Sequence, residues 1–370
     1  MCDNVDHNKI QNKSNQICDI TLMILCVFFA EQLLLNSSVV NHAVGASLEL
    51  CINTVIPSLF CFMVLTAFVS SSKLGSWLCV PMLPLCRLLC IPVNCGSIML
   101  LSLIGGYPSG AKALADAWKQ KVISESVLRR MILFVVCPAP SFVVITLGSY
   151  YFHNQSVGWL LYVSQMLSVL FIAFITSFSA PVQNKQYLSK SMFRHNGSTY
   201  SYALVEAVTF SSSALLNMCG YIILFGVITS LVAQFHLSEE ILAVISAILE
   251  ICGACGKLTT LTVPYKMCLL SFFLSFGGLS VQFQLKSILR ECPCSFPRIM
   301  IGRIVQGFCS AVFTHLMLRC FPQVVHVFSA DSMISPIKDS STPIMSLCLI
   351  GMLMILLTDF ERKTKDKIKR

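Results

Sequence analysis

Long apolar runs separated by short polar stretches dominate the hydrophobic pattern of this chain. A transmembrane helix needs about 20 predominantly apolar residues. Four runs meet this requirement without a helix-breaking residue, at positions 17–35, 157–178, 299–318 and 343–359. The pattern therefore predicts membrane-spanning helices at these four positions.

Six further apolar regions are longer or carry residues that interrupt helices. They are 43–70 with Pro57, 77–104 with Pro81, Pro84 and Pro92, 128–151 with Pro138 and Pro140, 203–235 with Gly220 and Gly226, 241–258 with Glu250, and 264–289 with Gly277 and Gly278. Backbone that leaves helical geometry inside a bilayer must find its hydrogen bonds in protein or in a water-filled cavity. Broken helices therefore tend to mark binding sites, and in transporters they occur in matched pairs.

The two halves of the chain resemble each other around a pair of glycines. "LSLIGG" at 101–106 ends an apolar run in the first half, and "LSFGG" at 274–278 ends one in the second. Such internal similarity is typical of duplicated transporter halves. We predict an all-α, polytopic membrane protein with two pseudo-symmetric repeats that contain broken or re-entrant helices.

The composition supports this class. Of the 370 residues, 55% are hydrophobic and only 12% are charged, whereas soluble domains carry about 25% charged residues. The net charge of +9 is explained by Lys and Arg in cytoplasmic loops. No basic, aromatic-bearing soluble face is evident, so nucleic acid is not an expected partner.

The distribution of Lys and Arg predicts how the chain is oriented and divided. The tail 361–370 and the segment 286–298 are basic and expected in the cytoplasm, whereas 36–42, 150–156 and 321–342 suit the outer side. The predicted organisation is a polar N-terminal tail (1–16), a first membrane half with one repeat (17–182), a basic cytoplasmic loop (183–200), the second repeat (201–290), C-terminal transmembrane helices (291–360) and a basic cytoplasmic tail (361–370).

The segment "GGYPSGAK" at 105–112 almost matches two known chemical motifs. A phosphate-binding P-loop needs Lys directly after its last Gly and then Ser or Thr, but Ala111 and Ala113 occupy the positions on either side of Lys112. The Ser-x-x-Lys pair of penicillin-binding enzymes needs companion S-D-N and K-T-G elements, and neither tripeptide occurs in the chain. We therefore expect no enzyme activity, no catalytic residue and no cofactor.

A third interpretation is an anion site at a helix N-terminus. Gly105, Gly106 and Gly110 permit a tight turn, after which we expect a helix from Ala111 onward with Lys112 in its first turn. Free N–H groups at a helix start favour an anion. Lys opposes the helix dipole there, which suggests a role beyond folding. The alternative is a re-entrant turn whose lysine extends to water.

Other polar residues in apolar surroundings extend this candidate site. Glu250 is expected inside a short hydrophobic helix, where an acid is costly and couples to a cation or proton, or simply pairs with Lys257. Cys pairs at 252–255 and 292–294 lack the partners of a metal site, so no metal is predicted. The candidate substrate-binding residues are Gly105, Gly106, Tyr107, Pro108, Ser109, Gly110, Lys112, Ser141, Glu250, Gly277, Gly278, Ser280 and Gln282.

Several of these segments resemble a known family. "SLIGGYPSGAKALADAW" (102–118), "ISESVLRRMILFVVCPAPSF" (123–142), "LEICG" (249–253) and "FGGLSVQFQLKSIL" (276–289) are similar to the YlbJ (SpoVV) family of sporulation integral membrane proteins. That family is grouped with the nucleoside-recognition or Gate-domain membrane proteins. The chain departs from the family pattern at 137–141 and 252–254, where expected polar side chains are replaced.

The resemblance implies transport of dipicolinic acid across the outer forespore membrane during endospore formation. Because no ATP-binding motif is evident, a secondary or facilitative carrier is expected, with a small anionic substrate, a lipid bilayer around it and a coupling ion acting through Glu250. The alternatives are a nucleoside or ion carrier of the same fold and a non-transporting assembly factor for the spore envelope. Whether the protein forms a homo-oligomer stays open.

Overall fold

The computed structural model describes residues 3–72, 74–179, 200–262 and 265–321. Within them all regular structure is helical, and no strand is present. Six segments of this described part are long and apolar enough to cross a membrane: Gln16–Leu35, Ser37–Ser71, Gln155–Ser179, Tyr200–Ala233, Lys266–Ile288 and Phe296–Cys320. The prediction of an all-α, polytopic membrane protein is confirmed.

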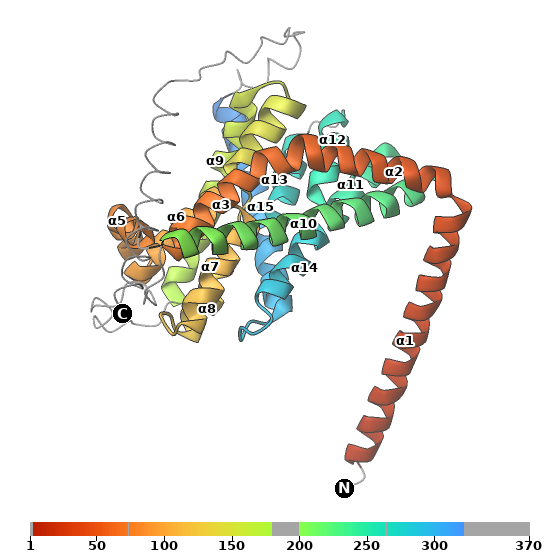
Figure 1. Ribbon diagram of the computed structural model, residues 1–370, viewed down its shortest axis with the longest axis horizontal. Helices are drawn as coiled ribbons and strands as arrows, with labels where there is room; N and C mark the ends of the chain where they lie inside the picture. The colour runs from red at the N-terminus through yellow and green to blue at the C-terminus, as the bar shows by residue number, and fades with distance from the viewer. Residues whose placement is uncertain (1–2, 73, 180–199, 263–264, 322–370) are drawn as a thin grey trace, which may run out of the picture.

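Three of the four uninterrupted runs form long helices as predicted. They are α1 (Asp3–Leu35), α9 (Gln155–Ile175, continued by the short η4, Thr176–Ser179) and α15 (Phe296–Cys320). The fourth run, 343–359, lies outside the described residues, as do most of the predicted cytoplasmic loop 183–200 and the tail 361–370. Helix α1 projects away from the rest of the molecule (Figure 1), and none of its apolar span is buried.

Two long helical runs lie side by side across the molecule (Figure 1). One is α2 (Ser37–Leu50), η1 (Cys51–Val55) and α3 (Ile56–Ser71); the other is α10 (Tyr200–Ala233). The expected interruptions at Pro57, Gly220 and Gly226 are therefore wrong. Proline lacks an N–H, and the π-helical turn η1 directly before Pro57 absorbs this mismatch without ending the helix.

The other four regions do break, as their Pro, Gly and Glu residues indicated. The pair α5 (Cys79–Leu88) and η2–α6 (Val93–Cys95, Gly96–Gly105) is bent by 118°. The remaining breaks separate α6 from α7 (Tyr107–Lys119), α8 (Glu125–Met131) from the π-helix η3 (Ser141–Tyr151), α11 (Glu239–Leu249) from α12 (Ile251–Thr260), and α13 (Lys266–Phe276) from α14 (Gly278–Ile288). The four-residue α4 (Leu74–Trp77) links α3 to α5.

The ends that the positive-inside rule assigns to the cytoplasm lie at one edge of the helical body. Arg130 of α8 contacts the C-terminal end of α9 through Thr176, and Arg129 donates to the carbonyl of Pro293, between α14 and α15. Lys119, at the end of α7, pairs with Glu291 in the same connection. The end of α9 and the connection between α14 and α15 therefore lie on the same side of the molecule, as the distribution of Lys and Arg predicted. Which side of the membrane they face stays a prediction.

Candidate site at the helix breaks

The break between α6 and α7 is made by one glycine. Gly106 has φ 80° and ψ −172°, a backbone conformation that is essentially restricted to glycine. Pro108 is the second residue of the new helix, where its missing N–H costs nothing. Helix α7 therefore begins at Tyr107, not at Ala111. Lys112 lies in the second turn, so the expectation that it stands at the helix start is wrong.

The neighbouring glycines serve close packing rather than the turn. Gly105 is the last residue of α6 and Gly110 is inside α7. A Cβ on Gly110 would lie 2.5 Å from the Ser102 Cβ and 2.8 Å from the Val135 carbonyl oxygen. Any larger residue at this position would push α7 away from the segment that follows α8.

A second break, between α13 and α14, has similar chemistry. Gly277 and Gly278 both have positive φ, 80° and 73°. Gln282 on the following turn reaches back, and its Nε2 donates to the freed carbonyl of Phe276 at 2.8 Å. Its Oε1 is buried and has no hydrogen-bond partner among the described residues.

Each glycine break lies against another interruption of the chain. A Cβ on Gly106 would lie 3.1 Å from the Cβ of Ala139, in the extended segment between α8 and η3. A Cβ on Gly278 would lie 3.1 Å from the Cα of Glu250, where α11 ends and α12 begins. Tyr107 then joins the two pairs, because its hydroxyl donates to the carbonyl of Leu274. Four interruptions far apart in the sequence thus converge in the interior.

Glu250 lies at a break and not within a helix, so that expectation is wrong. Its backbone is extended, and its carboxylate accepts from the N–H groups of Cys252 (2.9 Å) and Gly253 (2.6 Å) at the start of α12. The side chain is 4% exposed and neutralises the positive end of its own helix. The expected alternative partner, Lys257, instead donates to Ser246 Oγ at 3.3 Å.

Glu250 and Lys257 nevertheless line one cavity, of about 280 Å³, together with His42 of α2. The cavity opens between α2, α10, α11 and α12. Its volume is large enough for several waters, and a buried acid, a lysine and a histidine line the same space. This arrangement is suited to proton or cation exchange.

The most deeply buried charge of the described residues was not among the predicted site residues. Arg303 of α15 is fully buried and has the largest side chain among the fully buried residues that the structure describes. Its Nη1 donates to the Val136 carbonyl and to Gln306 Oε1, and its Nη2 donates to the Ser275 carbonyl. The guanidinium carbon lies 5.7 Å from the centre of the Tyr107 ring. Arg303 therefore joins the segment after α8, the end of α13 and the start of α7.

The sequence did contain a signal for Arg303. It lies inside the predicted span 299–318, but only five residues from Arg298, and a helix rises about 1.5 Å per residue. Such an arginine resembles one that extends to the membrane surface. Helix α15 instead directs it inward, together with the buried Gln306, Ser310 and Thr314.

A chain of buried hydroxyl and amide groups continues from Arg303 along α9, α13 and α15. Gln165 Nε2 donates to the Ser271 carbonyl and hydroxyl, both at 3.0 Å, and its Oε1 accepts from Ser275 at 2.5 Å. The hydroxyl oxygens of Ser275 and Ser310 lie 2.8 Å apart, and Thr314 donates to Ser271 at 2.7 Å. Buried polar networks of this kind fix helix positions when their members are satisfied.

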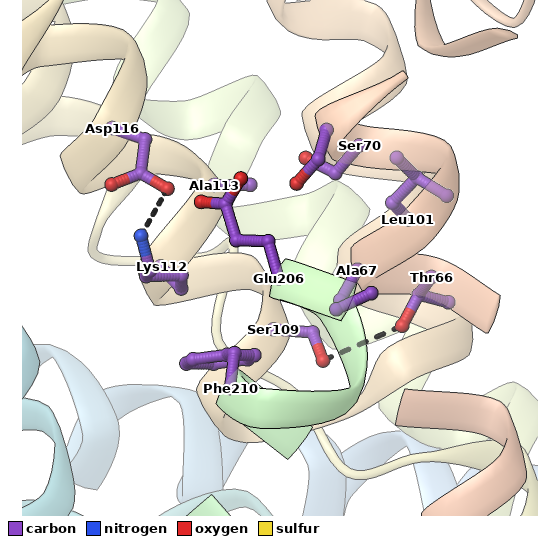
Figure 2. A pocket seen from close by; sticks show the side chains of 12 residues that line it. Thr66, Ala67, Ser70, Leu101, Ser109, Lys112, Ala113, Asp116, Glu206 and Phe210 are labelled. Carbon is purple, nitrogen blue, oxygen red and sulfur yellow. Dashed lines mark hydrogen bonds and ion pairs between the residues drawn. The ribbon is translucent and has the colours of Figure 1, made fainter. Parts of the chain in front are cut away.

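Lys112 lies in a different place, beside α3, α6 and α10. Figure 2 shows it paired with Asp116, while Glu206 extends from α10 into the same pocket. The pocket holds about 30 Å³, room for about one or two waters. Its two carboxylates outnumber its single cation. Ser109, also predicted, lines this pocket and hydrogen-bonds Thr66 at 3.5 Å.

The remaining predicted residues are buried near the breaks. Ser141 begins η3, and its hydroxyl has no partner among the described residues. Ser280 lies on the first turn of α14 and is 1% exposed. The structure thus gathers Gly106, Tyr107, Gly277, Gly278 and Gln282 into one centre, with Glu250 at its side. Substrate binding by these residues and by Lys112 stays a prediction.

The fold and this centre define a class: a multi-pass α-helical membrane protein whose polar groups gather where its helices break. The chain is 26% identical over 345 residues to the sporulation integral membrane protein YlbJ of Bacillus subtilis (strain 168), a match that covers 81% of this chain and 83% of the relative. No family model matches the sequence, and no solved structure matches the fold. This similarity over most of the chain supports the resemblance to the YlbJ family of sporulation integral membrane proteins that the sequence motifs indicated.

Proposed function

We propose that this protein is a secondary or facilitative carrier that moves a small organic anion, dipicolinic acid, across the outer forespore membrane. The observation that carries the proposal is the convergence of four helix interruptions in the interior. Carriers bind their substrates where discontinuous helices meet, because the freed backbone groups and helix ends supply polar contacts inside the membrane. The sporulation relative supplies the cellular setting.

A buried positive charge beside this centre favours an anionic substrate. Arg303 is enclosed without an acidic partner among the described residues, and a buried charge is costly unless it is paired. Two uncapped helix starts, at Tyr107 and Gly278, contribute further partial positive charge. A planar dianion such as dipicolinate matches this electrostatic environment better than a neutral nucleoside does.

Coupling to an ion gradient is proposed at Glu250. Lys257 and His42 line the same cavity, so protonation of the acid changes the charge of a cavity next to Gly278. The exposed α1 span and the other lipid-length helices place the protein in a bilayer. We propose a cytoplasmic C-terminus, and whether the protein forms a homo-oligomer stays open.

The test is uptake of labelled dipicolinate into liposomes that contain the purified full chain, beside protein-free liposomes. We expect protein-dependent uptake, and none of labelled uridine. Uptake of uridine alone would contradict the proposal in favour of a nucleoside carrier. No uptake of either by folded protein would favour an assembly role. A Lys112→Ala variant tests the earlier site prediction: retained uptake removes Lys112 from the substrate path.

A further inference from the structure

We propose that Arg303 binds a carboxylate group of the transported molecule, and that the ligand class is planar organic carboxylates. The inference rests on the proposed function and assigns its anion-binding residue. A dedicated site is indicated because the guanidinium lies at the meeting point of three segments, the residues after α8, the end of α13 and the start of α7.

The hydrogen bonds of Arg303 leave two donors unused. A guanidinium has five N–H groups. Nη1 contacts two acceptors, the Val136 carbonyl and Gln306 Oε1, and Nη2 contacts one, the Ser275 carbonyl. One N–H on Nη2 and the N–H on Nε remain, and Nε is buried with no partner among the described residues. A carboxylate takes two parallel N–H bonds from an arginine.

The charge of Arg303 is also unbalanced. Within the described residues it forms no ion pair, although it is 0% exposed. An intramembrane cation without a resident counter-ion is a functional-site hypothesis by default. Lys112 differs in this respect, because Asp116 already pairs with it and Glu206 shares its pocket.

The surroundings of Arg303 fit a flat carboxylate. The Tyr107 ring lies 5.7 Å from the guanidinium carbon and offers an aromatic surface beside the charge. Gln306 Nε2 is buried and has no partner among the described residues, while Oε1 of the same amide accepts from Arg303. Gln306 therefore provides a free donor for a heteroatom next to the carboxylate. Since Arg303 is enclosed, binding requires the junction to open, as alternating access demands.

The experiment measures the affinity of purified full-length protein for three probes: dipicolinate, benzoate and the uncharged dipicolinamide. The variants are Arg303→Gln, Arg303→Lys and, as a matched control, Arg298→Gln on the same helix. We expect Arg303→Gln to lower the affinity for dipicolinate and for benzoate at least about 10-fold. Arg303→Lys keeps the positive charge but loses the two parallel N–H donors of the guanidinium, so its affinity for both carboxylates should lie between those of the wild type and Arg303→Gln. The Arg298→Gln control should bind both carboxylates as the wild type does, and dipicolinamide should bind to none of the proteins.

A second variant covers the case in which Arg303→Gln does not fold. Gln306→Glu is nearly isosteric and places a resident carboxylate on Arg303, because Oε1 already accepts from Nη1 at 2.6 Å. It should unfold at a higher temperature than the wild type and bind carboxylates at least about 10-fold more weakly.

The outcomes separate this inference from the proposed function. Wild-type affinity for dipicolinate in Gln306→Glu or Arg303→Gln overturns the inference, and uptake by the wild type would then still support the carrier. Arg303-dependent binding of benzoate without any dipicolinate uptake supports the inference and contradicts the proposed substrate. If neither dipicolinate nor benzoate binds the wild-type protein, the inference is overturned.

Discussion

The hydroxyl of Tyr107 donates to the main-chain carbonyl of Leu274. The first residue of α7, directly after the α6–α7 break, is therefore hydrogen-bonded to the last turn of α13, directly before the α13–α14 break. A parallel contact exists at the first break, where Tyr162 of α9 donates to the Leu103 carbonyl at 2.8 Å. The last carbonyls of a helix have no partner within it. Two tyrosines thus satisfy groups that the broken helices release in the membrane interior.

Replacement of Tyr107 by Phe should lower the free energy of unfolding by about 1–3 kcal/mol, because the buried Leu274 carbonyl loses its partner. Tyr162→Phe, which frees the Leu103 carbonyl, should cost a similar amount. Only Tyr107→Phe should also reduce dipicolinate uptake per folded molecule, since only Tyr107 joins the two glycine breaks. Thermal unfolding in detergent and liposome uptake measure the two effects. Equal uptake by both variants would contradict a role of Tyr107 at the junction.

A change of Gly106 to Ala should destabilise the protein by about 2 kcal/mol or more. The residue must keep φ 80°, and the new Cβ would contact Ala139 at 3.1 Å. Gly220 of α10 is the matched control: nothing lies within 4 Å of its Cβ position. Gly220→Ala should be neutral or stabilising by up to about 1 kcal/mol. Similar unfolding temperatures for the two variants would show that the α6–α7 junction tolerates another geometry.

Arg130 and Arg129 are neighbours with different expected effects. Arg130 donates to the carbonyls of Leu89, Cys90 and Ala173, at the C-terminal ends of α5 and α9. Arg130→Met should therefore cost about 2–3 kcal/mol in unfolding free energy. Arg129 is more exposed and pairs with Glu125 one turn away, so Arg129→Met should cost about 1 kcal/mol or less. The reverse order of unfolding temperatures would contradict the capping role of Arg130.

The ion pair between Lys119 and Glu291 predicts a small pH effect. The hydrogen bond from Lys119 lowers the pKa of the Glu291 carboxyl, and the same hydrogen bond raises the pKa of Lys119. Because the folded-state pKa of Glu291 lies below its ordinary value of about 4.3, the stabilisation is complete above that pH. It is lost as the pH falls through the lowered value.

Lys119→Gln should therefore unfold at a slightly lower temperature than the wild type at pH 7, and the two curves should meet in strong acid. Both groups are exposed, so added salt should shrink the difference as well. Glu291→Gln provides the control, because it removes the same pair from the other side. A difference that persists unchanged at the acid end would have another cause.

Sequence patterns predicted the class, most of the helix breaks and several residues of the centre. Glycine and proline interrupt helices through their own backbone chemistry, which is why the breaks at Gly106, at Gly277 and at Pro138 and Pro140 were identified. The predicted break at Pro57 is wrong because a π-helical turn can accommodate the missing N–H. The prediction that Glu250 lies inside a helix is wrong because an acid in an apolar run can itself cap a new helix.

Arg303 and Lys112 show what sequence spacing does not reveal. The direction of Arg303 depends on how α15 packs against α9 and α13, which involves residues more than 100 positions away. Asp116, one helical turn after Lys112, was visible in the sequence as an i,i+4 partner. The contribution of Glu206 to the same pocket needs the tertiary arrangement of α7 and α10.

The central claim, a carrier whose site lies where the helices break, is tested most directly by counterflow. Liposomes that contain the purified protein are loaded with unlabelled dipicolinate and diluted into a trace of labelled dipicolinate. A carrier with one alternating site predicts a transient accumulation of label above its equilibrium level, because entry is exchanged for exit. Label that rises only to equilibrium in loaded and unloaded liposomes alike, or that does not enter, would contradict the account.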